Sequence, residues 1–87
     1  MRAVITVIGK DMVGILAKVS TCCAEANANV IEVTQSVLQE FFAMVMLIDI
    51  ENMNCDLGQL RENLKQNVPG MKIHVMHEDI FNSMHRI

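Results

Sequence analysis

The sequence has no tryptophan, no tyrosine and a single proline, and three phenylalanines supply all of its aromatic side chains. A core without large aromatic residues must be built from aliphatic side chains, methionine and these phenylalanines. The chain also lacks any cluster of lysine or arginine, and its formal net charge is -3. Because binding to a phosphate backbone requires a basic surface, we expect no direct nucleic-acid partner.

Long apolar runs are also missing. No stretch approaches the roughly 18 residues that span a bilayer, and the N-terminus has no hydrophobic region of the signal-peptide kind. The three cysteines are an odd number, and the adjacent residues Cys22 and Cys23 have poor geometry for a structural disulfide. These features favour a soluble protein of the reducing cytoplasm with no membrane partner.

The length of 87 residues leaves room for one domain, which we expect to span residues 1–87. A chain this short buries only about two-thirds of the surface that its unfolded form exposes, so its stability alone should be marginal. Pairing of two copies would bury more apolar surface. We therefore expect a homodimer.

Four segments have the composition and alternation of strands, with many apolar and β-branched residues. They are residues 1–8, 30–40, 41–50 and 71–78. The third segment is apolar at both parities, which predicts a central strand covered on both faces. It follows the second almost at once, so we expect a hairpin with a tight turn near Gln39 and Glu40.

The segment 30–40 predicts a half-exposed strand. Its apolar side chains Ile31, Val33 and Val37 share one parity. The other parity carries polar side chains, namely Glu32, Thr34 and Ser36. Strict alternation would place the three apolar residues on one face of the sheet.

Three segments have helical spacing. Apolar residues recur at this spacing in residues 15–26, which the turn-forming run Asn27-Ala28-Asn29 should end. Leucines recur at i, i+3 and i+7 from Leu57, up to the break at Pro69-Gly70. The tail, residues 79–87, has one apolar stripe, and so short a helix must dock on something to be stable. Its apolar residues are Ile80, Phe81, Met84 and Ile87.

The element order is βαββαβ followed by a short C-terminal helix, which predicts an α+β fold with a core over residues 1–78 and a tail over residues 79–87. Two right-handed crossovers give a four-stranded antiparallel sheet with two helices on one face. The other face would then carry an apolar patch that the tail helix or a second subunit should cover. We expect this patch to contain Val4, Ile8, Val45, Leu47 and Met76.

The segment between the first strand and the first helix reads Gly9-Lys10-Asp11-Met12-Val13-Gly14-Ile15. Asp11 could cap the helix, and backbone N–H groups around Met12, Val13 and Gly14 could hold a carboxylate at the positive helix end. Gly14 would let a ligand or a neighbouring chain approach the backbone closely. An ordinary capped loop with glycines for tight turns is the alternative interpretation of the same residues.

At these residues the sequence resembles the ACT domain family. The first strand ends in Val7-Ile8-Gly9-Lys10-Asp11, Gly14-Ile15 opens a helix, Asn29-Val30 enters the next strand, and Gln35 lies within it. The resemblance covers the whole chain. The ending Ile80-Phe81-Asn82-Ser83-Met84 is similar to the tail of small stand-alone proteins with one ACT domain, relatives of the glycine cleavage system repressor.

The resemblance implies a ferredoxin-like fold and regulatory binding of an amino acid at a homodimer interface. Carried over by position, the ligand site would have two parts. The loop part comes from one subunit, and the strand part lies nearby or across the interface. The loop residues are Asp11, Met12, Val13, Gly14 and Ile15, and the strand residues are Asn29 and Val30.

Other reactive residue types give weaker signals. His74 and His77 are three apart on one predicted strand, so they should point to opposite faces and cannot share a metal ion. The cysteines have no CxxC spacing, and free cysteine commonly packs as a small apolar residue. We find no nucleophile–base pair, no metal cluster and no phosphate loop in the sequence, and we expect neither an enzyme nor a cofactor or metal site.

Two functions therefore remain from the sequence. The first is a regulatory module that binds an amino acid or a similar small metabolite at a homodimer interface. The alternative is a structural or protein-interaction domain that dimerises or docks a partner through its apolar sheet face, with the loop empty. A calorimetric titration with the twenty amino acids separates the two.

Overall fold

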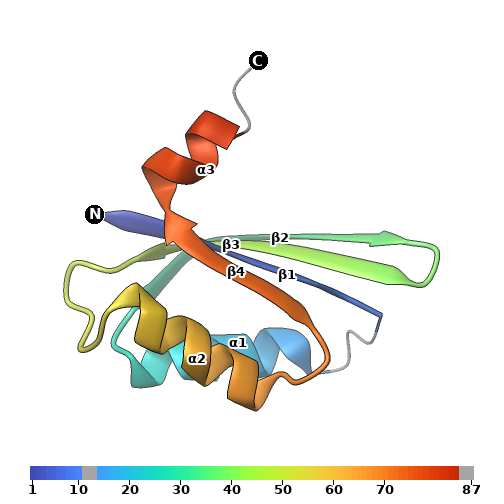
Figure 1. The fold of residues 1–87 in the computed structure, drawn as a ribbon, viewed down its shortest axis with the longest axis horizontal. Coiled ribbons are helices and arrows are strands. Elements are labelled where there is room, and N and C mark those ends of the chain that lie inside the picture. The colour runs from blue at the N-terminus through green and yellow to red at the C-terminus, as the bar shows by residue number, and fades with distance from the viewer. Residues whose placement is uncertain (11–13, 85–87) are drawn as a thin grey trace.

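The computed structural model describes residues 1–10 and 14–84, and residues 11–13 and 85–87 lie outside the description. The chain forms four strands and three helices in the described ranges (Figure 1). In chain order they are β1 (Arg2–Gly9), α1 (Ile15–Glu25), β2 (Asn29–Leu38), β3 (Phe41–Asp49), α2 (Leu57–Asn67), β4 (Lys72–His77) and α3 (Glu78–Met84).

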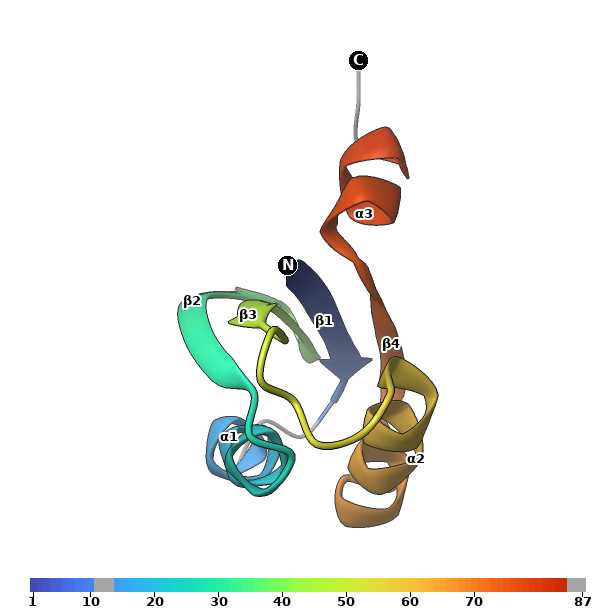
Figure 2. The ribbon, with the colours of Figure 1, turned by 90° about the vertical axis from the view of Figure 1, so that its left-hand side faces the viewer.

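The strands form one antiparallel sheet in the order β2-β3-β1-β4. Figure 2 shows α1 and α2 together on one face, with α1 on the β2 side and α2 on the β4 side. The predicted α+β sandwich with two helices on one face is confirmed. So is the central place of β3, which pairs with β1 on one side and β2 on the other.

The hydrophobic core fills the layer between the helices and the sheet. Its members are aliphatic or sulfur-containing, apart from Phe42, as the scarcity of aromatic residues in the sequence requires. The largest buried side chains are those of Phe42, Ile5, Met44, Met46, Ile48, Leu60, Leu64, Val7, Val19, Val68 and Cys23. Thioether side chains are flexible and fill irregular gaps, so Met44 and Met46 supply volume that an aromatic ring would otherwise provide.

Asparagine and aspartate side chains define the helix ends. Asn27 has a left-handed backbone with φ of 60° directly after α1, as its place in the sequence predicted. Its side-chain amide donates to the carbonyl oxygen of Asn52 at 2.8 Å, and the amide of Asn54 donates to the carbonyl oxygen of Glu25 at 2.9 Å. The end of α1 is therefore tied to the loop that leads into α2. The carboxylate of Asp56 caps α2 by accepting the Gln59 backbone N–H at 2.7 Å.

A β-bulge in β2 overturns one expectation about its faces. The register passes from Val30 opposite Ile48 to Glu32 opposite Leu47, which leaves Ile31 without a partner in β3. Val30 and Val33 consequently share the helix-covered face, while the side chain of Ile31 is 45% exposed. The prediction that Ile31 shares a face with Val33 was wrong, because it assumed strict alternation through the whole strand.

The face of the sheet away from α1 and α2, here called the open face, is only partly covered. Ile8 and Val45 are exposed on it as expected, at 44% and 36%. Val4 on the same face is only 3% exposed, so the tail helix or a neighbouring element covers part of the expected patch. The short helix α3 explains this difference, because it contacts β1 and β4 and rises over the end of the sheet where β1 begins (Figures 1 and 2).

Candidate functional site

Gly14 determines how the loop after β1 enters the first helix. It is the N-cap residue of α1, with a left-handed backbone of φ 72° and ψ 2°, a conformation that residues with a Cβ rarely adopt. Its carbonyl oxygen accepts the Lys18 N–H at 3.0 Å, which closes the first helical turn. The helix therefore begins three residues further along the chain than one whose N-cap residue is Asp11, and Asp11 itself lies outside the described residues.

No acidic side chain in the first turn of α1 offsets the partial positive charge at the start of this helix. Glycine offers no side-chain oxygen to the first N–H groups, and the first turn contains no acidic residue. Ile15 turns its side chain into the core and is 5% exposed, so it can offer a ligand only its backbone. The predicted residues Asp11, Met12 and Val13 lie outside the described part of the chain.

Asn29 and Val30, the strand part of the predicted site, lie at the far end of the sheet. Asn29 pairs with Asp49, which in turn pairs with Arg2 at the start of β1. The loop leaves from Gly9, seven residues along β1, and at about 3.3 Å per residue this is roughly 23 Å away. Asn29 is exposed and Val30 half-buried. Within one chain, the structure therefore does not bring the two parts of the predicted site together.

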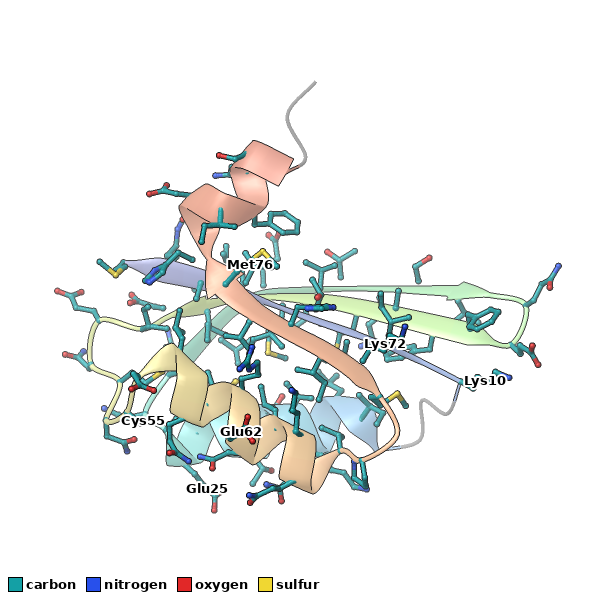
Figure 3. The ribbon with its side chains drawn as sticks, in the orientation of Figure 1. Lys10, Glu25, Cys55, Glu62, Lys72 and Met76 are labelled. Carbon is teal, nitrogen blue, oxygen red and sulfur yellow. The ribbon has the colours of Figure 1, made fainter. Side chains whose placement is uncertain are left out.

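A pocket lies at the loop end of the sheet, where three segments meet, and sequence reasoning missed it. The pocket has a volume of about 430 Å³. It is lined by Ile8, Gly9, Lys10, Phe41, Pro69, Gly70, Met71 and Lys72. These residues come from three separate segments, and no spacing within one segment could have predicted their meeting. Figure 3 shows Lys10 and Lys72 at this end of the sheet, away from α3.

Lys10 is held loosely at the rim of this pocket. Its ammonium nitrogen lies 4.0 Å from a carboxylate oxygen of Glu40 and 5.8 Å from the centre of the Phe41 ring. Both side chains of the ion pair are about two-thirds exposed, so water and salt screen their attraction. The ion pair of Lys10 with Glu40 is therefore weak.

Met71 packs directly against Gly9 beside the same pocket. A Cβ placed on Gly9 would lie 1.8 Å from the Met71 sulfur, far inside any real contact distance. Close approach of Met71 therefore favours glycine at this position, and a larger residue would displace the Met71 side chain. The start of the loop is fixed to the start of β4 through this contact.

The adjacent cysteines Cys22 and Cys23 behave as core residues rather than as reactive groups. Cys22 and Cys23 are 4% and 0% exposed, and burial raises the pKa of the Cys23 thiol to about 11. Burial also raises the pKa of Cys22, with a smaller contribution from the charge of Glu25. A thiol with a raised pKa forms little of the reactive thiolate at neutral pH.

His74 and His77 lie as expected on opposite faces of β4. His74 pairs in register with Thr6 and lies on the open face, whereas His77 pairs with the buried residue Ala3. Among residues 1–10 and 14–84, no group of three or more histidine, cysteine or acidic side chains is placed to hold a metal ion. None of the helices in these ranges is long and apolar enough to cross a membrane.

Comparison with known proteins assigns the chain to a family. The profile of the ACT domain matches residues 2–77, and the chain therefore belongs to the ACT domain family. Within this family it is similar to a UPF0237 protein of Methanopyrus kandleri, with 46% identity over 99% of this chain and 98% of that protein. The match to a relative of nearly equal length agrees with the expected resemblance to small proteins with one ACT domain.

Solved structures support the same assignment. An ACT domain protein from Streptococcus pneumoniae is 35% identical, with a TM-score of 0.76 over 98% of both chains. A candidate glycine cleavage system transcriptional repressor has the same fold at 23% identity, with a TM-score of 0.67 over 85% of this chain and 43% of that one. The ferredoxin-like ACT fold predicted from the sequence is thereby confirmed.

Proposed function

We propose that this chain is a regulatory module that binds an amino acid at an interface between two copies, and that it catalyses no reaction itself. The observation that carries the proposal is the separation of the two parts of the candidate site. Gly14 lies at one end of the sheet and Asn29 at the other, so one chain cannot complete a site that uses both.

Pairing of strand β2 with β2 of a second copy would bring the two parts of the site together. Among the described strands β2 pairs only with β3, and its outer edge has backbone N–H and C=O groups available for another strand. Two copies of β2 joined antiparallel about a twofold axis near the strand centre would place Asn29 of one copy beside Leu38 of the other. That is the end of the sheet from which the loop leaves β1.

The chemistry of the loop suits an amino-acid ligand. Such a ligand carries a carboxylate and an ammonium group, so its site must supply both donors and acceptors. The N–H groups at the start of α1, which Gly14 cannot cap with a side chain, and the positive helix end would bind the carboxylate. We assign Asp11 as the partner of the ammonium group. The side-chain amide of Asn29 from the second copy can donate to the carboxylate or accept from the ammonium group.

Gly14 and Ile15 support this assignment in different ways. The Cβ position of Gly14 has no heavy atom within 4 Å, so the backbone is open to a ligand. The burial of Ile15 anchors the first turn of the helix in the core. The N–H groups that face the ligand are therefore held by a packed side chain. The three free cysteines suit a cytoplasmic location, which we include in the proposal.

Calorimetric titration with each of the twenty amino acids tests the ligand class. Binding of at least one amino acid is expected, and Asp11→Ala and Asn29→Ala should each abolish it while the circular dichroism spectrum stays unchanged. Gln66→Ala on the exposed surface of α2 is the matched control and should bind as the parent does. If no amino acid binds, the chain is better explained as an interaction domain with an empty loop.

Mixing the two variants tests whether the site is shared between copies. A heterodimer of Asp11→Ala and Asn29→Ala would contain one intact site and one doubly altered site. After exchange of subunits, about a quarter of all sites should regain binding, because half of the dimers are mixed and each has one good site. No recovery in a mixture with demonstrated subunit exchange would contradict a shared site.

A further inference from the structure

The open face of the sheet has a groove that the proposed amino-acid site does not use. It has a volume of about 500 Å³ and lies over β1, β3 and β4. The pocket of about 430 Å³ beside Lys10 adjoins it, because Ile8 lines both. The two together are here called the long groove, which follows β1 from the loop end of the sheet toward α3.

The positive charges of the long groove lie at the loop end. Lys72 pairs in register with Ile8, so its side chain leaves the sheet on the open face. Lys10 follows β1 directly, and both lysines line the pocket and are exposed. Figure 3 shows them at the end of the sheet away from α3, and Met76 at the base of α3. A small anion at the loop end would therefore lie near two ammonium groups.

The charges of the two lysines are offset to different degrees. The ammonium nitrogen of Lys10 lies 4.0 Å from a carboxylate oxygen of Glu40, which weakens its attraction for another anion. Within the described ranges Lys72 makes no ion pair. Lys72 is therefore expected to be the stronger partner of an anion, and Lys10 the weaker.

The rest of the long groove is mostly apolar and is closed at its far end. Ala43, Val45 and Met76 line it from the sheet, and Phe81 lines it from α3. Helix α3 contacts β1 and β4 and leaves Val4 only 3% exposed, so the groove ends there. The long groove is thus open at its positive end and closed at its apolar end.

The size and the lining match those of small-molecule sites. Such sites usually have about 300–1,000 Å³, and they combine a mostly apolar lining with a few polar groups at fixed places. The polar residues that line the groove over β1 and β4 are Thr6 and His74, which pair with each other in register. The remaining polar groups are those of the two lysines at the loop end.

We propose that the long groove binds a medium-chain carboxylic acid, with its carboxylate near Lys10 and Lys72 and its alkyl chain over Ile8, Ala43 and Val45. A ligand of this kind matches both ends of the groove. Its head forms charge-assisted hydrogen bonds with the ammonium groups, and its chain covers apolar surface that water otherwise contacts. A neutral hydrocarbon would use only the lining, and a small polar anion only the lysines.

The distance between the two ends sets the length of the chain. Ile8 and Val4 are four residues apart on β1, or about 13 Å at about 3.3 Å per residue. With C–C bonds of about 1.5 Å, an extended chain of about ten carbon atoms has this length. Longer chains would meet α3, and shorter chains would leave part of the apolar lining exposed. Decanoate is therefore the probe.

Calorimetric titration with decanoate, below the concentration at which it forms micelles, should show saturable binding of one molecule per chain. Each methylene added between hexanoate and decanoate should tighten binding about two- to fourfold, because the groove buries one side of the alkyl chain. Dodecanoate should gain no further affinity, because its last carbons meet α3. Decanol and decylammonium have the same chain without the negative charge, and both should bind at least tenfold more weakly.

Substitutions of exposed charged residues test the head-group site without disturbing the core. Lys72→Gln should weaken decanoate binding at least fivefold, and Lys10→Gln should have a smaller effect. Glu40→Gln removes the charge that offsets Lys10 and should tighten binding about twofold. Lys65→Gln is the matched control, because it removes an exposed lysine of α2 on the other side of the sheet, and it should bind as the parent does.

Ala43→Leu tests the apolar part of the site. Ala43 is half-buried on the open face of β3, opposite Ile8, and a larger side chain there would occupy the groove. Decanoate binding should fall at least tenfold, while urea unfolding shows that the fold is kept. The lysine variants test the proposal independently of how well this variant folds.

The results separate this site from the amino-acid site. Asp11→Ala should bind decanoate as the parent does, and Lys72→Gln should still bind the amino acid. Decanoate binding without any amino-acid binding would support the long groove and contradict only the proposed function. The absence of saturable decanoate binding, equal affinity for decanol, or unchanged affinity in both Lys72→Gln and Ala43→Leu would each overturn the long-groove proposal.

Discussion

Gly9→Ala tests the contact between the end of β1 and Met71. Glycine in a strand costs roughly 0.5 kcal/mol relative to alanine, so a substitution without steric conflict should stabilise the protein slightly. Here the new methyl group would lie 1.8 Å from the Met71 sulfur and 2.9 Å from its terminal carbon. Met71 must therefore leave its place against the core, and overpacking of this kind costs about 1–3 kcal/mol.

The expected net result is a loss of about 1 kcal/mol, because the thioether can move and Met71 is only half-buried. Removing the obstacle should reverse the sign. In the Met71→Ala background, Gly9→Ala should stabilise by about 0.5 kcal/mol, which gives a coupling free energy of about 1.5 kcal/mol. Urea unfolding at one fixed protein concentration measures all four proteins of this double-mutant cycle.

Gly58→Ala in α2 is the matched control for the chemical change. The nearest atom to its new Cβ would be a carboxylate oxygen of Asp56 at 3.4 Å, which is an ordinary contact. This substitution should stabilise by about 0.5–1 kcal/mol through helix propensity. Equal effects of Gly9→Ala in the parent and in the Met71→Ala background would refute the steric account.

Three further predictions concern stability. Asp56→Ala removes the side-chain cap of α2 and should cost about 1 kcal/mol in urea unfolding, whereas Asp56→Asn should keep most of the parent's stability because its amide oxygen can accept the same N–H. Between pH 9 and pH 11 the folded protein keeps the Cys23 proton that the unfolded chain loses, so stability should fall with rising pH by about 2 kcal/mol. A Cys23→Val variant should lack this part of the pH dependence. A stability profile identical to that of the parent would contradict the role of the Cys23 thiol. Deleting residues 80–87 should lower the melting temperature because Val4 loses its cover, whereas an unchanged temperature would show that α3 does not stabilise the sheet.

The sequence predicts the fold well because periodicity controls it. Each strand and helix lies where its apolar spacing indicated, and the sulfur-rich core follows from the scarcity of aromatic residues. The face of Ile31 could not be predicted in this way, because the bulge arises from pairing with β3 rather than from a local pattern. The burial of Val4 depends on where α3 docks, and this too is a tertiary effect.

The candidate site was predicted less completely, for a geometric reason. Gly14 and Asn29 are only 15 positions apart in the sequence, with one helix between them. Strand β2 runs parallel to β1, so it begins at the end of the sheet where β1 begins, whereas the loop before Gly14 leaves from the other end. In the pocket beside Lys10, by contrast, the fold brings distant parts of the sequence together. Its residues are distant in sequence, and the sheet register brings Gly9 and Lys72 to the same end.

The bulge at Ile31 also bears on how the length of this domain can change in evolution. Deleting one residue within a regular strand turns every following side chain to the opposite face, which would exchange buried and exposed residues. At Ile31 a deletion would remove only the unpaired residue and leave Val30 and Glu32 opposite their present partners in β3. Strand β2 therefore has one position where the chain can shorten by a residue while both halves of the strand keep their faces.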